Sequence, residues 1–398
     1  MIETQSAKSV LPNGSQRLHE IDGMRATAAL LVVIHHFATS GIVLVVSKAG
    51  FGKLAQLISL TTNSGVELFF VLSGVVLLRP FLRGLRPFAA QPYFRRRVER
   101  LWPPYAAALV LGSAVILIAS LHPTWYSKQV LPAFSVSGVA RQVAIVNFGW
   151  PIYNLAWWSL TPELLFYLVA PLVVALLAVR GMRQPMLLGL IGAASILSAL
   201  LWNEKTSMPG VQSGFVHVGL QFLAYLPCFM VGATLAKFDI DSRGARALLG
   251  VGIAYLILAL YLPRLNVHAA FGLIYGAIVC SAMRRGGILN AILTAPTSVW
   301  LGERSYSLFL VHFSILYFCD YFASLVLHHR GVAYAISTRL FGFILSVLVA
   351  MTIFSLVERR FARGLTTAEA FWPWQVLRTR ATAPAMPSPV NADVLTAS

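Results

Sequence analysis

Runs of about 20 apolar residues recur along this 398-residue chain. An α-helix needs about that length to cross the hydrocarbon core of a bilayer. Only helices and closed barrels satisfy their backbone hydrogen bonds there. Charged residues make up 11% of the chain, which is less than half of the share usual in soluble domains. The sequence therefore predicts an all-α, polytopic transmembrane bundle and excludes a disordered or simple soluble protein.

Apolar runs and helix breakers divide the chain into about ten candidate spans. We place them at 25–46, 64–82, 104–121, 153–178, 185–202, 215–236, 247–262, 266–283, 299–320 and 334–357. Residues 1–18 form a cytoplasmic N-terminal segment and 19–357 the membrane domain. Residues 358–398 are predicted to be a disordered cytoplasmic tail, because their end is rich in Pro, Ala and Ser.

The distribution of basic residues predicts the orientation of these spans. If the N-terminus is cytoplasmic, the inner segments carry 23 of the 31 Lys and Arg residues and the outer segments carry 8. Lys and Arg are retained on the cytoplasmic side, so we expect both termini there. The polar N-terminus lacks the apolar core of a cleavable signal, so we expect the first span itself to direct insertion. We expect a multi-pass protein of the inner (plasma) membrane.

The same distribution explains the formal net charge of +17 as topology. In a soluble protein that charge would suggest a nucleic-acid partner, but here we expect membrane lipids around the chain and no nucleic acid. The three cysteines lie far apart and show no metal-ligand spacing, so no metal site is expected.

The first predicted span, IDGMRATAALLVVIHHF, contains ionisable residues, which usually mark function inside a membrane. Arg25 lies at the cytoplasmic entrance. His36 follows eleven residues later, a rise of about 16 Å and a rotation of about 1100°, which places it near the bilayer middle on the face of Arg25. His35 lies about 80° away from Arg25. A neutral imidazole is a natural general base for a hydroxyl; the alternative is that both histidines only form interhelical hydrogen bonds.

The segment RRRVERLWPPY precedes the third span. Arg97 and Arg100 are three residues apart and therefore share a helical face. Two guanidinium groups there are suited to bind phosphates, although anchoring on the cytoplasmic side is an equal alternative. Because Pro103 and Pro104 lack backbone donors, we expect a new helix to begin at them.

The segment WWSLTPELLFYLVAPL places Glu163 near mid-depth. A carboxylate at that depth needs a partner or a proton, and both structural pairing and catalysis are consistent with this. Trp157 and Trp158 lie nearer the outer surface, where an aromatic belt is the default explanation. Trp158 is also a candidate pocket residue.

A late segment, WLGERSYSLFLVHF, places Ser305 and His312 on one helical face. We treat both as candidate pocket residues, with core packing as the alternative for His312.

Glu67 begins the second span and is expected to be solvated. Gly74 is small enough to allow close helix packing. His268 lies near an outer span end, where contact with water explains it.

Five segments together resemble the acyltransferase-3 family of membrane O-acyltransferases. They are IDGMRATAALLVVIHH, SGVELFFVLSG, RRRVERLWPPY, WWSLTPELLFY and LGERSYSLFLVH, in that order. The resemblance covers residues 19 to 357. It implies a ten-span enzyme with cytoplasmic termini that moves an acyl group, often acetyl, from acyl-coenzyme A to a sugar hydroxyl.

The resemblance also implies roles for particular residues. The motifs of the family fall on Arg25, His36, Arg97, Arg100, Glu163, Ser305, Tyr306 and Ser307. His36 falls in the catalytic place, and the paired arginines are associated with coenzyme binding. The chain departs from the family in two motifs: Leu164 follows Glu163 where relatives often carry a second acid, and Glu67 replaces an aspartate. No SGNH-hydrolase domain follows the last span, so we expect a stand-alone form.

These observations predict direct acyl transfer within the membrane. Phosphates of acyl-coenzyme A, expected to be acetyl-coenzyme A, bind Arg97 and Arg100. His36 accepts a proton from a hydroxyl of a cell-surface or exported glycan or of a lipid-linked sugar, while Arg25 or Glu163 orients the imidazole or stabilises charge. The alternative is a proton-coupled glycan or lipid transporter or flippase with His36 and Glu163 as a relay, which leaves the arginine pair without a role.

Overall fold

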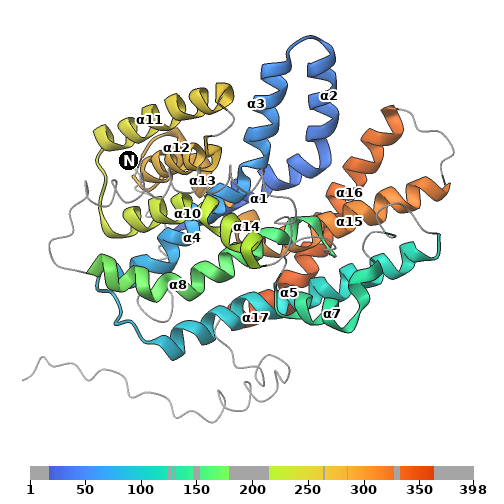
Figure 1. The fold of residues 1–398 in the computed structure, drawn as a ribbon, viewed down its shortest axis with the longest axis horizontal. Coiled ribbons are helices and arrows are strands. Elements are labelled where there is room, and N and C mark those ends of the chain that lie inside the picture. Colours follow the sequence, from blue (N-terminus) through green and yellow to red (C-terminus); the bar gives the residue numbers. More distant parts are fainter. Residues whose placement is uncertain are drawn as a thin grey trace, which may run out of the picture.

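The structure is a computed structural model. It describes residues 18–122, 128, 131–146, 153–178, 215–262, 265–284, 286–326 and 332–362. Within these ranges every regular element is helical and no strand occurs, which confirms the all-α prediction (Figure 1). The predicted span 185–202 lies outside the described residues.

The helices are long and apolar enough for a multi-pass membrane protein. In the described part of the chain, seven helices have the length and composition of a membrane span. The count is eight if the bent pair His19–Thr39 and Gly41–Lys48 forms one span. Val267–Ala282 is a shorter apolar helix. The count of ten and the cytoplasmic placement of the termini stay predictions.

The longer helices are α1 His19–Ile34, α2 Ser40–Lys48, α3 Gly52–Asn63, α4 Gly65–Leu82, α5 Ala90–Ser120, α8 Leu160–Ala178, α10 Phe215–Lys237, α11 Ser242–Tyr261, α12 Val267–Ala282, α15 Ser305–Val326 and α16 Val332–Ile353. Several of them, such as α4, α10 and α12, lie within a few residues of predicted spans, whereas α3 was not predicted and α5 begins at Ala90, well before the span predicted at 104–121. Shorter helices are α7 Val136–Val143, α13 Ile288–Thr294, α14 Pro296–Glu303 and α17 Arg359–Ala362, with 3₁₀ turns at Leu131–Phe134 and Leu155–Ser159 and π-helical turns at His35–Thr39 and Phe354–Glu358.

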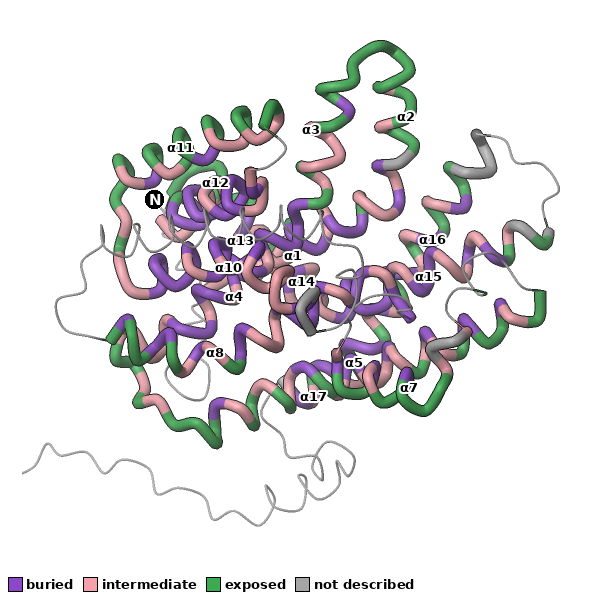
Figure 2. Tube along the Cα trace, in the orientation of Figure 1, coloured by how far each residue is buried: buried purple, intermediate pink, exposed green. Residues whose placement is uncertain are grey.

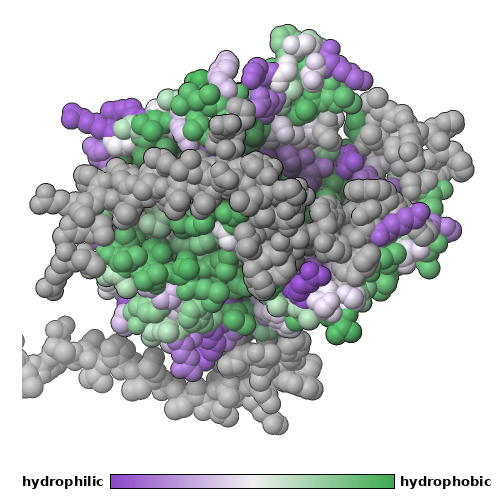
Figure 3. Space-filling view, in the orientation of Figure 1, coloured by the Kyte–Doolittle hydropathy of each residue, from purple (hydrophilic) through white to green (hydrophobic). Residues whose placement is uncertain are grey.

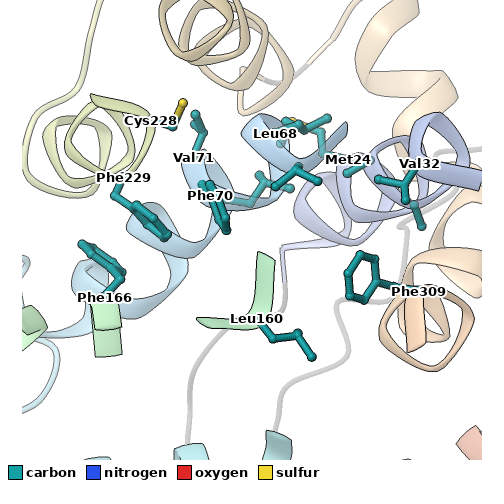
Figure 4. Close-up of a cluster of buried hydrophobic side chains, with 14 of the residues drawn as sticks. Met24, Val32, Leu68, Phe70, Val71, Leu160, Phe166, Cys228, Phe229 and Phe309 are labelled. Carbon is teal, nitrogen blue, oxygen red and sulfur yellow. The ribbon is translucent and has the colours of Figure 1, made fainter. Parts of the chain in front are cut away.

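Helices α4 and α10 cross at a pair of glycines. A Cβ atom on Gly74 would lie 2.4 Å from the carbonyl oxygen of Phe229, and one on Gly232 would lie 2.1 Å from that of Val71. Only glycine permits this backbone approach, which confirms the packing role predicted for Gly74. Beside the crossing, Phe229 stacks on Phe70 and Phe166, with centroid distances of 4.4 and 4.1 Å (Figure 4).

The outer surfaces of several helices are apolar. Leu168, Leu172 and Leu176 repeat every four residues on α8, and each is more than half exposed. Figure 3 shows apolar side chains gathered over α8 and α10. Such a surface suits lipid rather than water, in agreement with a multi-pass membrane protein. The hairpin of α2 and α3 projects from the rest and is largely exposed (Figures 1 and 2).

Two local features differ from the sequence predictions. Pro103 and Pro104 lie inside α5, so the prediction that a helix begins at them is wrong. The arginines before them therefore belong to the same helix as the apolar segment after them. Helical structure also continues past residue 357 through the π-helical turn Phe354–Glu358 into α17. Residues 358–362, which we assigned to the beginning of a disordered tail, are therefore helical.

Candidate active site

A cleft of about 740 Å³ lies between α1, α4, α5, α8 and α15. This volume is within the range of small-molecule sites. Along α4 the lining residues extend from Val66 to Pro80, which corresponds to about 21 Å at 1.5 Å per residue. The cleft is therefore long as well as voluminous, and it suits an extended ligand.

Four arginines from three helices line this cleft: Arg25 from α1, Arg79 from α4, and Arg97 and Arg100 from α5. The acidic side chains in the lining are Asp22 and Glu163. Cations therefore outnumber anions on the cleft wall. In a site shielded from water, such an excess attracts an anionic ligand strongly.

Arg97 and Arg100 lie on one face of α5 as predicted, and both reach the cleft. The guanidinium of Arg97 lies over the rings of Tyr93 and Tyr167, 5.5 and 5.9 Å from their centroids. Its Nε atom is buried and has no hydrogen-bond partner in the described part of the chain; the same is true of Nη1 of Arg79. Buried donors without partners are rare in proteins, so these two are suited to a ligand.

Glu163 lies in the first turn of α8 and also lines the cleft. It accepts hydrogen bonds from the hydroxyl groups of Tyr167 and, at 3.4 Å, of Ser73 on α4. The carboxylate therefore has the partners that its depth requires. The arginines of the cleft are close enough to act on its charge, because Arg25 and Arg97 both interact with it electrostatically.

His36 lies apart from these residues. The π-helical turn His35–Thr39 follows α1 directly. Since His36 is only the second residue of this turn, the chain from Arg25 to Ile34 is regular α-helix. Arg25 lines the cleft, and His36 is not among the lining residues. Its ring remains partly exposed.

His36 is paired with a second imidazole. Nδ1 of His36 lies 2.9 Å from the carbonyl oxygen of Val32 and 3.3 Å from Nε2 of His312 on α15. The two ring centroids are 5.1 Å apart. His312 is fully buried, and the rings of Phe313 and His36 are nearly perpendicular, with centroids 5.4 Å apart. The structure therefore brings together two histidines that are 276 residues apart in the sequence.

A phenylalanine of the cleft lining also contacts the histidine pair. Phe69 and Phe309 line the cleft, and their rings meet edge to face at 6.0 Å. The Phe309 ring is also 6.0 Å from the ring of His312. Phe309 and His312 are one turn apart on α15, a rise of about 4.5 Å. One residue of the cleft lining, Phe309, thus lies one helical turn from His312.

The other residues predicted from the first and last motifs have separate surroundings. Nδ1 of His35 lies 3.2 Å from the hydroxyl of Thr62, within the bundle. Tyr306 lines the cleft, and its hydroxyl donates to the carbonyl oxygen of Leu101 at 2.9 Å. Ser305 is buried at the start of α15, and its Oγ has no hydrogen-bond partner in the described ranges.

The neighbouring tryptophans differ from each other. Trp158 packs against Tyr225, with centroids 5.4 Å apart, and is not among the residues lining the cleft. Trp157 is fully buried and donates from Nε1 to the carbonyl oxygen of Leu310 at 3.0 Å. The aromatic-belt explanation is therefore wrong for Trp157, because its indole is inside the bundle.

Glu67 was expected to be solvated and is instead buried, with 3% of its surface exposed. Its Oε1 lies 2.7 Å from Nδ1 of His268 on α12. This pair also contradicts the assignment of His268 to water contact alone. The pattern of neighbouring residues could not reveal this pair, because the two residues are 201 positions apart in the sequence.

Sequence reasoning missed Glu358. Its carboxylate is 5% exposed and accepts hydrogen bonds from the hydroxyl and the backbone N–H of Ser307, at 2.6 and 3.2 Å. Arg25 and Arg100 are near enough to act on its charge. A glutamate directly after a long apolar run was the available signal, since such a residue can remain at membrane depth. Among the described residues, no group of three or more His, Cys, Asp or Glu side chains is arranged to hold a metal ion.

Comparison with known proteins identifies the family of this chain. The profile of a family described as an acyltransferase domain matches residues 18–357. The chain is 24% identical to the peptidoglycan O-acetyltransferase OatA of Listeria monocytogenes over 74% of this chain and 49% of that protein. It is 25% identical to a putative O-acetyltransferase of Staphylococcus aureus, over 75% of this chain and 50% of that protein. It is 26% identical to the acyltransferase MdmB of Streptomyces mycarofaciens, over 77% of this chain and 81% of that protein.

This chain thus spans about half of the length of the first two relatives and most of the third. No solved structure matches it.

Proposed function

Because this chain belongs to the acyltransferase-3 family, we propose that it transfers an acyl group, most simply acetyl, from acyl-coenzyme A to a hydroxyl of a cell-surface or exported glycan. The observation that supports this best is the arginine-lined cleft, one of whose lining residues, Phe309, contacts the ring of His312, the partner of His36. The cleft is suited to an anionic, extended donor, and the imidazole is suited to deprotonate an acceptor.

In the proposed reaction, the phosphates of the coenzyme bind Arg97 and Arg100, with Arg79 nearby. The pantetheine arm lies along α4 and brings the thioester toward Phe309. Arg25 adds a positive charge to the cleft wall that attracts the donor, and Glu163 partly offsets the charge of the arginines around it. His36 accepts the proton of the acceptor hydroxyl. General-base catalysis of this kind contributes about 10²–10⁴-fold.

The acceptor is proposed from the relatives. The Listeria relative is named as an enzyme that acetylates peptidoglycan, and the Staphylococcus relative as a putative O-acetyltransferase. A glycan or lipid-linked sugar approaching from the side opposite to the donor cleft fits a residue such as His36, whose ring is partly exposed but not to the cleft. We propose the inner (plasma) membrane as the location.

The rival function is a proton-coupled glycan or lipid transporter. It would use His36 and Glu163 as a relay, yet these two side chains share no hydrogen bond in the described part of the chain. It also gives no use to the unpartnered donors of Arg79 and Arg97. The enzyme therefore accounts for more of the site.

The decisive experiment measures transfer of label from acetyl-coenzyme A to surface glycans by isolated membranes. We expect His36→Ala to lower the rate by about 10²–10⁴-fold, because it removes the general base. His122→Ala, at an exposed histidine, is the matched control and should keep full activity. Normal turnover by His36→Ala would end the general-base assignment, and glycan movement without consumption of the donor would favour the transporter.

A further inference from the structure

The hydrogen-bond partners of the two paired histidines define which ring nitrogen carries the proton. A carbonyl oxygen can only accept, so the contact of 2.9 Å between Nδ1 of His36 and the carbonyl of Val32 requires a proton on that Nδ1. Nδ1 of His312 lies 2.8 Å from the carbonyl of Phe309 and 3.2 Å from that of Leu308. It must carry a proton for the same reason.

The contact between the two rings agrees with this assignment. With its proton on Nδ1, neutral His312 has a lone pair on Nε2, and that atom is 3.3 Å from Nδ1 of His36. The N–H of His36 therefore points at two acceptors at once, the carbonyl of Val32 and the lone pair of His312. If the proton of His36 were on Nε2, its Nδ1 lone pair would face both acceptors, and two favourable contacts would become repulsive.

We infer that His312 is a positioning residue that holds His36 in its Nδ1–H tautomer, so that the Nε2 lone pair of His36 is the proton acceptor. Nε2 of His36 makes no hydrogen bond with any residue in the described ranges. What Nε2 does with a substrate rests on the proposed function, whereas the tautomer itself does not.

The proton and electron balance of the transfer follows from this assignment. The acceptor O–H bond breaks, its proton moves to Nε2 of His36, and the oxygen electron pair forms a C–O bond with the thioester carbonyl carbon. When the tetrahedral intermediate collapses, the C–S bond breaks, and the coenzyme thiolate takes the proton from Nε2. His36 returns to the Nδ1–H tautomer. While His36 is an imidazolium, its Nδ1–H still donates to Val32 and His312, so no group has to reorient.

The first test measures the tautomer directly. In ¹⁵N spectra of histidine-labelled protein in lipid bilayers, the signals of His36 are identified by their loss in His36→Ala. We expect a protonated Nδ1 and an unprotonated Nε2 in the neutral ring of the wild-type protein. A protonated Nε2 would overturn the inference, whatever the activity of the protein proves to be.

The second test uses variants of His312 with similar volume. His312→Leu removes the acceptor, so we expect a mixture of His36 tautomers and a kcat lower by about 10²-fold, with little change in the KM for acetyl-coenzyme A. His312→Gln offers an amide oxygen to the His36 N–H and should recover at least a tenth of wild-type kcat. Ser314→Ala, at a buried residue two positions along α15, is the matched control and should keep kcat.

The outcomes separate this inference from the proposed function. An inactive His36→Ala together with a fully active, correctly inserted His312→Leu would reject the positioning role and leave the general base intact. An active His36→Ala would reject the general base, and the spectra would still decide the tautomer. If His312→Leu does not accumulate in membranes, His312→Met provides the same comparison, and the wild-type spectrum remains decisive.

Discussion

The arginine-lined cleft and the histidine pair differ in whether their polar atoms have hydrogen-bond partners. In the cleft, buried nitrogen atoms of Arg79 and Arg97 have no partners among the described residues. In the histidine pair, each Nδ1 atom is held by a backbone carbonyl. Unused donors are suited to a ligand that arrives with its own acceptors, whereas satisfied donors fix an orientation. The comparison indicates that the cleft is built for binding and the histidine pair for a defined proton position.

The largest effect that would sharpen this comparison is expected from Arg97→Ala/Arg100→Ala. Hydrogen bonds to charged groups contribute about 1.5–3 kcal/mol each, so removing both side chains should raise the KM for acetyl-coenzyme A by about 10²-fold or more. We expect kcat to change much less, because binding in the ground state and in the transition state weakens equally. The measurement is the initial rate against donor concentration.

Arg96→Ala is the control for that pair, because Arg96 is exposed on the same helix and does not line the cleft. If the double variant and Arg96→Ala had equal KM values for the donor, the proposal that the donor binds in the cleft would be rejected. A loss of kcat with unchanged donor KM would break the comparison differently, since it would place the arginines in the chemical step.

A smaller effect is expected from Glu163→Gln, which keeps the shape of the side chain. Loss of a negative charge beside the arginines should lower the donor KM by about threefold, as a partly screened charge does. We expect kcat to remain within about threefold of wild type, because Glu163 lines the cleft and the proposed general base, His36, does not. Glu99→Gln, which alters a carboxylate paired with Arg95 outside the cleft lining, is the control. A hundredfold lower kcat would instead place Glu163 in catalysis.

The smallest effect should come from a charge pair outside both regions. Arg83 binds Asp239 through two hydrogen bonds of 2.8 Å, which lower the pKa of the Asp239 carboxyl below its ordinary value. Since Asp239 is 88% exposed, Asp239→Asn should destabilise the fold by less than about 1 kcal/mol. The activity should not change.

The stabilisation by this pair should depend on pH in a defined direction. A carboxyl with a lowered pKa in the folded state stabilises above its unfolded pKa and loses that contribution as the pH falls through the folded pKa. Thermal unfolding in detergent should therefore distinguish Asp239→Asn from wild type near pH 7, and the two should converge in acid. A difference that increases as the pH falls would contradict this account.

Local periodicity made part of the site predictable. Arg97 and Arg100 are three residues apart on a regular helix, so their common face followed from helical geometry and is observed. The glycine at position 74 was predicted to permit close packing for a similarly local reason. The same reasoning was not sufficient for Pro103 and Pro104, because α5 tolerates both prolines within a continuous helix.

The sequence by itself determined the polytopic helical fold and the family, because apolar runs and short motifs are encoded by neighbouring residues. Only the tertiary structure decided which distant residues meet: His36 with His312, Glu67 with His268, and Glu358 with Ser307. Likewise, only the structure shows that the cleft lining includes Arg25 and not His36. Each pair joins helices far apart in the chain, and burial inside the bundle, where unpaired polar groups are costly, holds them together.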